Sequence, residues 1–225
     1  MTGLALETVR KRRGVSQWKA AQMLGLSQSM LSHLETGRRR VSLEVAQRAA
    51  EVFGSDPTTL PLDAERRHSE EALASELGAL GYSGYAHLCG RLRNPAELLL
   101  DALDRSDLEV RTVEGLPYLV LKYPHLDWAW LLREAKLRNR QNRLGFVVSL
   151  ASRLALQAGS RVLPGVLEPV LRELEDARLV KEDTLCQESL PPSRKKHLRG
   201  VRSKLAAHWN LDTRISEADL AHYVA

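Results

Sequence analysis

The chain has 225 residues, with 33 basic and 28 acidic side chains that give a formal net charge of +5 at pH 7. No apolar run approaches the roughly 18 residues of a membrane-spanning helix, and the N-terminus lacks the apolar core of a secretory signal. We therefore expect a cytoplasmic protein that does not contact a membrane. Only Cys89 and Cys186 are present, far apart and without a histidine cluster, so we expect two reduced, partly buried thiols, no metal site and no cofactor.

Two short helices joined by a tight turn are predicted between Ser16 and Gly37, in the segment SQWKAAQMLGLSQSMLSHLETG. Ser16 can cap the first helix, Gly25 can supply a turn residue with positive φ, and Ser27 can cap the second helix. The apolar residues that a crossed helix pair must bury are Ala20, Leu24, Leu26, Leu31 and Leu34, with the small Ala21 at the crossing point. This is the spacing of a helix-turn-helix, and it leaves the polar residues of the second helix facing outward.

The segment from Leu4 to Leu60 resembles the Cro/C1-type (Xre) repressor domain. The positions that match this family's pattern are Arg10, Ser16, Gln17, Ala21, Leu24, Gly25, Leu26, Ser27, Leu31, Leu34, Glu35 and Gly37. Two positions depart from the pattern, since Ala20 replaces the usual Leu and Val41 replaces a common Pro. The resemblance covers about a quarter of the chain and implies a five-helix DNA-binding domain over residues 1–62.

The resemblance also implies roles for individual residues. Gln28 is expected to be the main base reader, because its amide offers the donor and acceptor that match adenine N6 and N7 in the major groove. Shorter or less selective base contacts are expected from Ser29, Ser32 and His33, and phosphate contacts from Gln17, Lys19, Arg38, Arg39 and Arg40. Arg10 and Glu35 are expected to form an internal ion pair. The alternative interpretation of Gln28 is an ordinary solvated helix face.

The charge distribution agrees with an N-terminal DNA-binding domain. Residues 1–62 carry nine basic and five acidic side chains, a net charge of +4, whereas the whole chain carries +5. The basic excess therefore lies in the segment that is expected to meet DNA.

The remainder of the chain is expected to form a second, all-helical domain at residues 69–225, after a short polar linker at residues 63–68. Capping and periodicity predict helices at residues 70–80, 95–103, 108–120, 128–138, 141–158, 164–178, 194–209 and 217–224. The run from Tyr118 to Tyr123 is interpreted as a helix end and not as a strand. The predicted fold class is all-α, with either a helical bundle or a short α-solenoid in the second domain.

Two features of the second domain have alternative interpretations. Trp128, Trp130 and Trp209 are either core anchors or an aromatic surface for a protein partner. The basic residues Arg133, Lys136, Arg138, Arg140 and Arg143, and the later run from Arg194 to Lys204, are either solvated helix faces or contacts for nucleic acid or an acidic partner.

The sequence contains no catalytic motif together with the other residues that its chemistry requires. The Ser16-Gln-Trp-Lys19 sequence matches the S-x-x-K nucleophile motif but lies within the helix-turn-helix. Cys89-Gly90 resembles the cleavage site of self-cleaving repressors, but the helical C-terminal part of this chain does not resemble their β-rich peptidase domain. There is no H-E-x-x-H, P-loop or G-x-G-x-x-G motif. We therefore expect a protein that is not an enzyme.

Three functions fit this sequence. The first, which we favour, is a homodimeric transcriptional repressor that reads palindromic double-stranded DNA, because pairing two such domains supplies adequate affinity. The second is an antitoxin that binds a toxin protein and represses its own operon. The third is a regulator whose helical domain senses a small-molecule effector.

Overall fold

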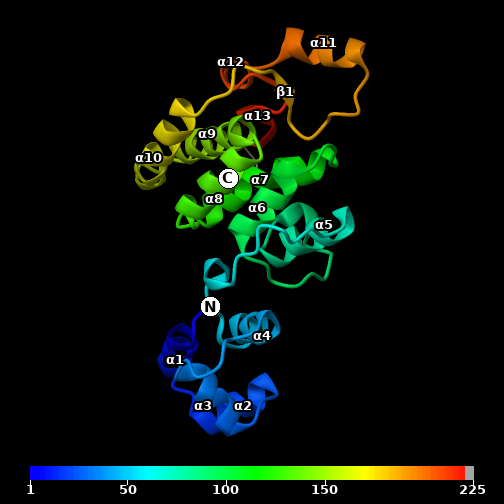
Figure 1. Ribbon diagram of the computed structural model, residues 1–225. Helices are drawn as coiled ribbons and strands as arrows, with labels where there is room; N and C mark the ends of the chain where they lie inside the picture. Colours follow the sequence, from blue (N-terminus) through cyan, green and yellow to red (C-terminus); the bar gives the residue numbers. More distant parts are fainter. Residues whose placement is uncertain (221–225) are drawn as a thin grey trace. The chain divides into compact units, whose positions relative to one another are not determined.

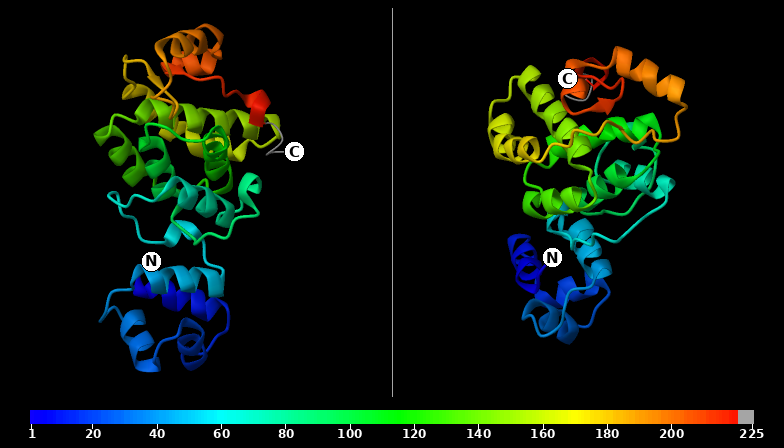
Figure 2. Two further views of the ribbon diagram at one scale, coloured as in Figure 1. Left: turned by 90° about the vertical axis from the view of Figure 1, so that its right-hand side faces the viewer. Right: turned by 45° about the horizontal axis from the view of Figure 1, so that its top comes forward.

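The computed structural model describes residues 1–220 (Figure 1). The chain divides into two compact units: Met1–Asp63 with Arg91–Asn94, and Ala64–Gly90 with the chain from Pro95 onward. Within the described residues, regular structure is helical apart from one two-stranded sheet, so the predicted all-α class is confirmed (Figures 1 and 2). No helix among residues 1–220 combines the length and the apolar character needed to cross a membrane.

The N-terminal unit contains four α-helices and one 3-10 turn: α1 (Gly3–Arg12), α2 (Gln17–Leu24), α3 (Gln28–Glu35), α4 (Leu43–Phe53) and η1 (Pro57–Thr59). Each α-helix begins at a capping hydroxyl, from Thr2, Ser16, Ser27 and Ser42 respectively. In each case the side-chain oxygen accepts a hydrogen bond from a backbone N–H in the first turn, which satisfies one of the free donors of the helix end. These short polar residues therefore fix where the helices start.

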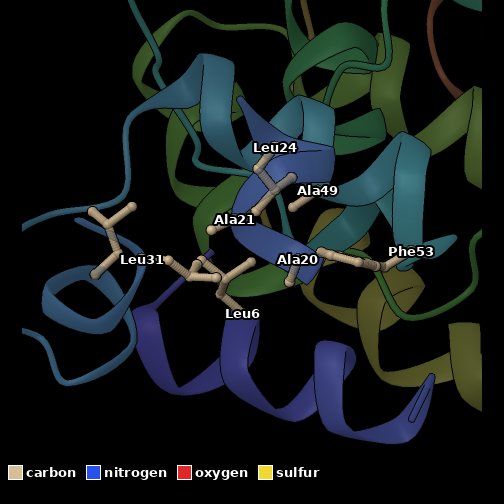
Figure 3. Packing of buried hydrophobic residues seen from close by; sticks show 8 residues of the cluster. Leu6, Ala20, Ala21, Leu24, Leu31, Ala49 and Phe53 are labelled. Atoms are coloured by element: carbon tan, nitrogen blue, oxygen red, sulfur yellow. The ribbon is translucent and has the colours of Figure 1, made fainter. Parts of the chain in front are cut away.

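The core of the N-terminal unit is drawn from all four α-helices (Figure 3). Its buried residues are Leu6, Ala20, Ala21, Leu24, Leu31, Leu34, Ala49 and Phe53. Three of these eight are alanines, and their small size allows α2 to pack closely against its neighbours α3 and α4. Ala20, which replaces the usual Leu of the family pattern, is completely buried in this core.

The fifth helix of this unit is a short 3-10 helix at residues 57–59 and not an α-helix. Asp56 caps the turn and Pro57 begins it, but Leu60 is extended (φ −64°, ψ 150°) in front of Pro61, where a proline disfavours helical backbone. The side-chain amide of Asn94 donates to the carbonyls of Thr58 and Leu60 at 3.0 and 2.8 Å. These bonds replace the helical hydrogen bonds that the turn lacks.

The C-terminal unit begins with α5 (Glu70–Ala79), η2 (Ser83–Tyr85), α6 (Pro95–Asp104), α7 (Val110–Lys122), α8 (Trp128–Leu137), α9 (Gln141–Gln157) and α10 (Val162–Asp176). Fourteen of the seventeen residues of α9 are buried, and this helix contacts α7, α8, α10, α12 and α13. A single central helix with neighbours on several sides is the arrangement of a bundle and not of stacked pairs. α7 runs through Lys122, so the interpretation of residues 118–123 as a helix end is confirmed.

The last part of the unit differs from the predicted helix at residues 194–209. The structure has two helices there, α11 (Pro192–Val201) and α12 (Lys204–His208), followed by α13 (Glu217–Leu220). The break occurs because Arg202 is extended and Ser203 caps α12, accepting from the backbone N–H of Ala206 at 3.1 Å. The rest of the helix expected at residues 217–224 lies outside the described residues.

A small parallel sheet that the sequence analysis did not predict joins β1 (Asp183–Thr184) to β2 (Leu211–Asp212). Asp212 is buried. It accepts a hydrogen bond from Arg199 at 2.9 Å and one from Arg202 at 3.0 Å. These ion pairs fasten α11 to the sheet.

Candidate nucleic-acid interface

The turn between α2 and α3 is fixed by backbone geometry and by one arginine. Gly25 adopts the left-handed conformation (φ 68°, ψ 32°) that glycine tolerates best, and the N–H of Leu26 donates to the carbonyl of Ala21 at 2.8 Å. Arg48, from α4, donates to the carbonyl of Leu24 at 3.1 Å. The turn between α2 and α3 is therefore fixed by its own backbone hydrogen bond and by the bond from Arg48.

The outward face of α3 carries the four residues expected to read bases. Gln28 and Ser29 are exposed at its first turn, whereas Ser32 and His33 are half-buried further along the helix. Ser29 shares a hydrogen bond with the hydroxyl of Ser27 at 3.1 Å. Within residues 1–220, the side chain of Gln28 has no hydrogen-bond partner, so its amide is available to a ligand in solution.

The three arginines that follow α3 are also exposed. Gly37 has a positive φ of 74° and redirects the chain after the helix, and the N–H of Arg39 then donates to the carbonyl of His33 at 3.0 Å. The Arg39 guanidinium lies 3.7 Å from the sulfur of Met30. In the described part of the chain, the side chains of Arg38 and Arg40 have no partner. The loop thus presents three positive charges beside α3.

The other two residues expected to contact phosphate differ in their surroundings. Lys19 is exposed in the first turn of α2. Gln17 is half-buried, and its side-chain amide donates to Glu35 at 3.0 Å. One amide N–H of Gln17 therefore points into the protein, which leaves a single donor on that amide for a phosphate oxygen.

Arg10 and Glu35 form an ion pair inside the N-terminal unit. Arg10 Nε donates to Glu35 Oε1 at 2.6 Å and Nη2 donates to Oε2 at 2.9 Å, while Nη1 donates to the carbonyl of Val15 at 2.9 Å. The side chains are only 10% and 3% exposed, respectively. The hydrogen bond to Glu35 raises the pKa of Arg10 above its ordinary value. This pair holds α1 against the C-terminal end of α3.

Sequence reasoning missed three features of this unit. Arg13 donates to the carbonyl of Phe53 at 2.7 Å, and Arg48 donates to that of Leu24, so each arginine satisfies the C-terminal end of a helix. Gly54 and Gly25 follow those helices, and they were the residues in the sequence that could have indicated where the helices end. Trp18 is 57% exposed on α2, and its sequence context gave no indication of this.

In the C-terminal unit, the basic side chains between residues 133 and 143 are paired with acids. The pairs are Arg133–Glu134, Lys136–Glu173, Arg138–Glu134, Arg140–Asp104 and Arg143–Asp183, at distances from 2.6 to 3.2 Å. This segment is therefore not a free basic face.

Arg143 is completely buried and also donates to the carbonyls of Leu103 and Arg105. Burial alone would lower its pKa, but the hydrogen bonds to Asp183 and Glu188 raise it, so the guanidinium stays charged inside the unit. Cys186 lies against this guanidinium, and burial raises the pKa of its thiol to about 11.

The tryptophans and cysteines of the C-terminal unit have different environments. Trp209 is buried and donates from its indole N–H to the hydroxyl of Ser149 at 3.0 Å, so it anchors the core. Trp128 and Trp130 are half-buried. Cys186 is buried, but Cys89 is exposed, which corrects the expectation of a partly buried thiol. Cys89 lies in an irregular loop that has no helix to cover it.

Comparison with known proteins agrees with the geometry of the N-terminal unit. A family model described as Helix-turn-helix matches residues 6–60. A protein of Pyrococcus horikoshii, provisionally named as an HTH-type transcriptional regulatory protein, is 40% identical over 75 residues, which are 33% of this chain and 24% of that protein. The chain thus spans about a quarter of the length of this relative. No solved structure matches. Residues 6–60 therefore form a helix-turn-helix domain of the Cro/C1 type.

Proposed function

We propose that the chain is a DNA-binding transcriptional regulator that places α3 in the major groove. The observation that carries this proposal is the first turn of α3, where the exposed amide of Gln28 has no partner among the described residues. A major groove about 12 Å wide admits an α-helix, and residues near the start of a recognition helix are those that reach base edges. Gln28 then reads adenine, and Ser29 makes a shorter contact beside it.

Phosphate contacts on this proposal come from the residues around α3. Arg38, Arg39 and Arg40 follow its C-terminal end, and Lys19 lies in the first turn of α2. Such contacts set affinity and orientation but carry no direct sequence information. Gln17 contributes only through the amide hydrogen that Glu35 does not accept.

Repression from a palindromic operator requires two such domains, so we further propose a homodimer held by residues after Ser69. The Leu-rich helices α6 and α9 cannot supply its interface, because nine of ten and fourteen of seventeen of their residues are buried within one chain. Exposed apolar side chains elsewhere in the C-terminal unit include Leu137, Leu156 and Val162. The antitoxin role is the alternative. Its partner surface would use Trp128 and Trp130, because Trp209 is buried and the basic side chains of residues 133–143 are paired.

The direct test is selection of bound duplexes from a random DNA pool with the full chain. We expect enrichment of an inverted repeat whose half-sites are centred about one helical turn apart. The Gln28→Ala variant, selected in parallel, should enrich a less defined sequence at one position of each half-site. A pool that shows no enrichment with the wild-type chain, or the same enriched sequence with both proteins, would contradict the proposal.

A further inference from the structure

A cavity of about 380 Å³ lies in the C-terminal unit, apart from the helix-turn-helix. It is open to solvent and is lined by the start of α7, by α11 and α13, and by the chain segments that follow β1 and β2. Its apolar lining includes Val113, Leu185 and Leu198, which are each less than a tenth exposed. A concave surface of this size that combines apolar and polar side chains suits a small organic molecule.

The walls of this cavity are held in place by contacts outside it. The segment after β1 is fastened to the start of α7, since the N–H of Leu108 donates to the carbonyl of Cys186 at 3.0 Å and Ser189 donates to Asp107 from its N–H and its hydroxyl. These bonds from Ser189 lower the pKa of Asp107. Lys195 of α11 donates to the carbonyl of Glu188 at 2.7 Å. These contacts fix the positions of the wall segments relative to one another.

The rim of the cavity carries two free positive charges. Arg194 and Arg214 line it and are exposed, and neither guanidinium has a hydrogen bond or ion pair within residues 1–220. Two nearby arginines are different, because Arg199 of α11 and Arg202, which follows this helix, are both bound to Asp212. An unpaired guanidinium beside an apolar pocket is a donor group for an anionic oxygen.

Two carboxylates also line the cavity, and one of them already has partners. Asp219 accepts hydrogen bonds from the N–H and hydroxyl of Ser216, at 2.9 and 2.7 Å, and so belongs to the start of α13. Glu114 is half-buried on α7 and can accept a hydrogen bond from a bound molecule. The two arginines are therefore the permanently charged donors of the lining, beside the neutral donors Gln187 and Thr213.

We propose that this cavity binds a small organic anion with an apolar body, whose acidic head pairs with Arg194 and Arg214. The apolar body rests on Val113, Leu185 and Leu198. The proposed site uses no residue of the N-terminal unit, since every residue named for it belongs to the C-terminal unit.

A suitable probe is 8-anilinonaphthalene-1-sulfonate, which combines an apolar aromatic body with one sulfonate and fluoresces strongly when it leaves water. Titration of the full chain should show saturable fluorescence, and octanoate should displace the probe because a carboxylate head satisfies the same arginines. The Arg194→Gln/Arg214→Gln double variant should bind at least ten-fold more weakly. The control is Arg161→Gln/Arg172→Gln, which removes the same charge from the residue before α10 and from α10 itself. Neither residue lines the cavity, so this variant should bind as the wild type does.

A second variant tests the apolar wall without a change of charge. Val110 lines the cavity and is 49% exposed, so Val110→Trp can be accommodated at the mouth and should lower probe affinity. Circular dichroism of each variant checks that it is folded. Absence of saturable binding to the wild type, or unchanged binding in a folded Arg194→Gln/Arg214→Gln variant, would overturn the proposal.

Discussion

Arg10 in α1 and Glu35 in α3 form a bidentate ion pair whose two bonds measure 2.6 and 2.9 Å. Glu35 also accepts from Gln17 at 3.0 Å, so one carboxylate links the first three helices of the N-terminal unit. Because Glu35 is the last residue of the helix that begins with Gln28, this carboxylate fixes the C-terminal end of α3.

Replacing Glu35 by Ala should destabilise the N-terminal unit by roughly 3 kcal/mol, because it leaves the buried guanidinium of Arg10 without its partner. Amide hydrogen exchange of the full chain measures this change. Peptides from α1 to α3 should exchange faster in the variant than in the wild type, whereas peptides from α9 should change little. Glu7→Ala is the matched control, since Glu7 pairs with Lys11 on the surface and its loss should leave exchange unchanged. Equal exchange in wild type and Glu35→Ala would show that the pair does not stabilise the unit.

Replacing Arg39 by Ala should weaken binding to the selected operator and to random DNA by similar factors, because a phosphate contact does not depend on sequence. The slope of log affinity against log salt concentration should fall in magnitude by about 1. Fluorescence anisotropy at several salt concentrations gives both quantities. A loss confined to the operator would instead make Arg39 a base reader.

Gly145 should not tolerate a larger residue, because a Cβ at this position would lie 2.3 Å from the ring of Trp209. Gly145→Ala should therefore destabilise the C-terminal unit by about 1 to 3 kcal/mol through overpacking. Gly165→Ala is the matched control in α10, where a Cβ meets nothing within 4 Å among the described residues and helix propensity favours alanine. Thermal unfolding should give a lower Tm for the first variant and an equal or higher Tm for the second. A Tm for Gly145→Ala that matches the wild type would contradict this packing.

The full chain should sediment as a homodimer with twice the mass of one chain at micromolar concentration. It should also bind a complete inverted repeat much more tightly than an isolated half-site, because the second domain then binds at a high effective concentration. Analytical ultracentrifugation and anisotropy provide the two measurements. A monomer that binds the repeat and the half-site equally well would exclude the proposed dimer.

Local sequence signals were sufficient for the helix-turn-helix. Ser16, Ser27 and Gly25 act within one or two turns of their own helices, and the structure has them as the two caps and the left-handed turn residue. The 3-10 turn at residues 57–59 was harder to foresee, since its carbonyls are satisfied by Asn94, more than thirty residues further along the chain.

Long-range pairing explains most of what sequence reasoning missed in the C-terminal unit. In the sequence, Arg143 is one of several basic residues on a predicted helix face. Its partners Asp183 and Glu188 lie 40 and 45 residues further along the chain. β1 and β2 contain two residues each, which is too short for any period of hydrophobicity to mark them. By contrast, the helix break at residues 202–203 had a local signal, because Ser203 is a capping residue.

We propose that Gln28 reads base sequence from the first turn of α3. A comparison of the full chain with its Gln28→Ala variant on two duplexes tests this role. The selected operator and a scrambled duplex of the same length are titrated at one salt concentration by fluorescence anisotropy. We expect a loss of about 1 to 3 kcal/mol of binding free energy per affected contact on the operator and almost no loss on the scrambled duplex. Equal losses on both duplexes, or no loss on either, would contradict it.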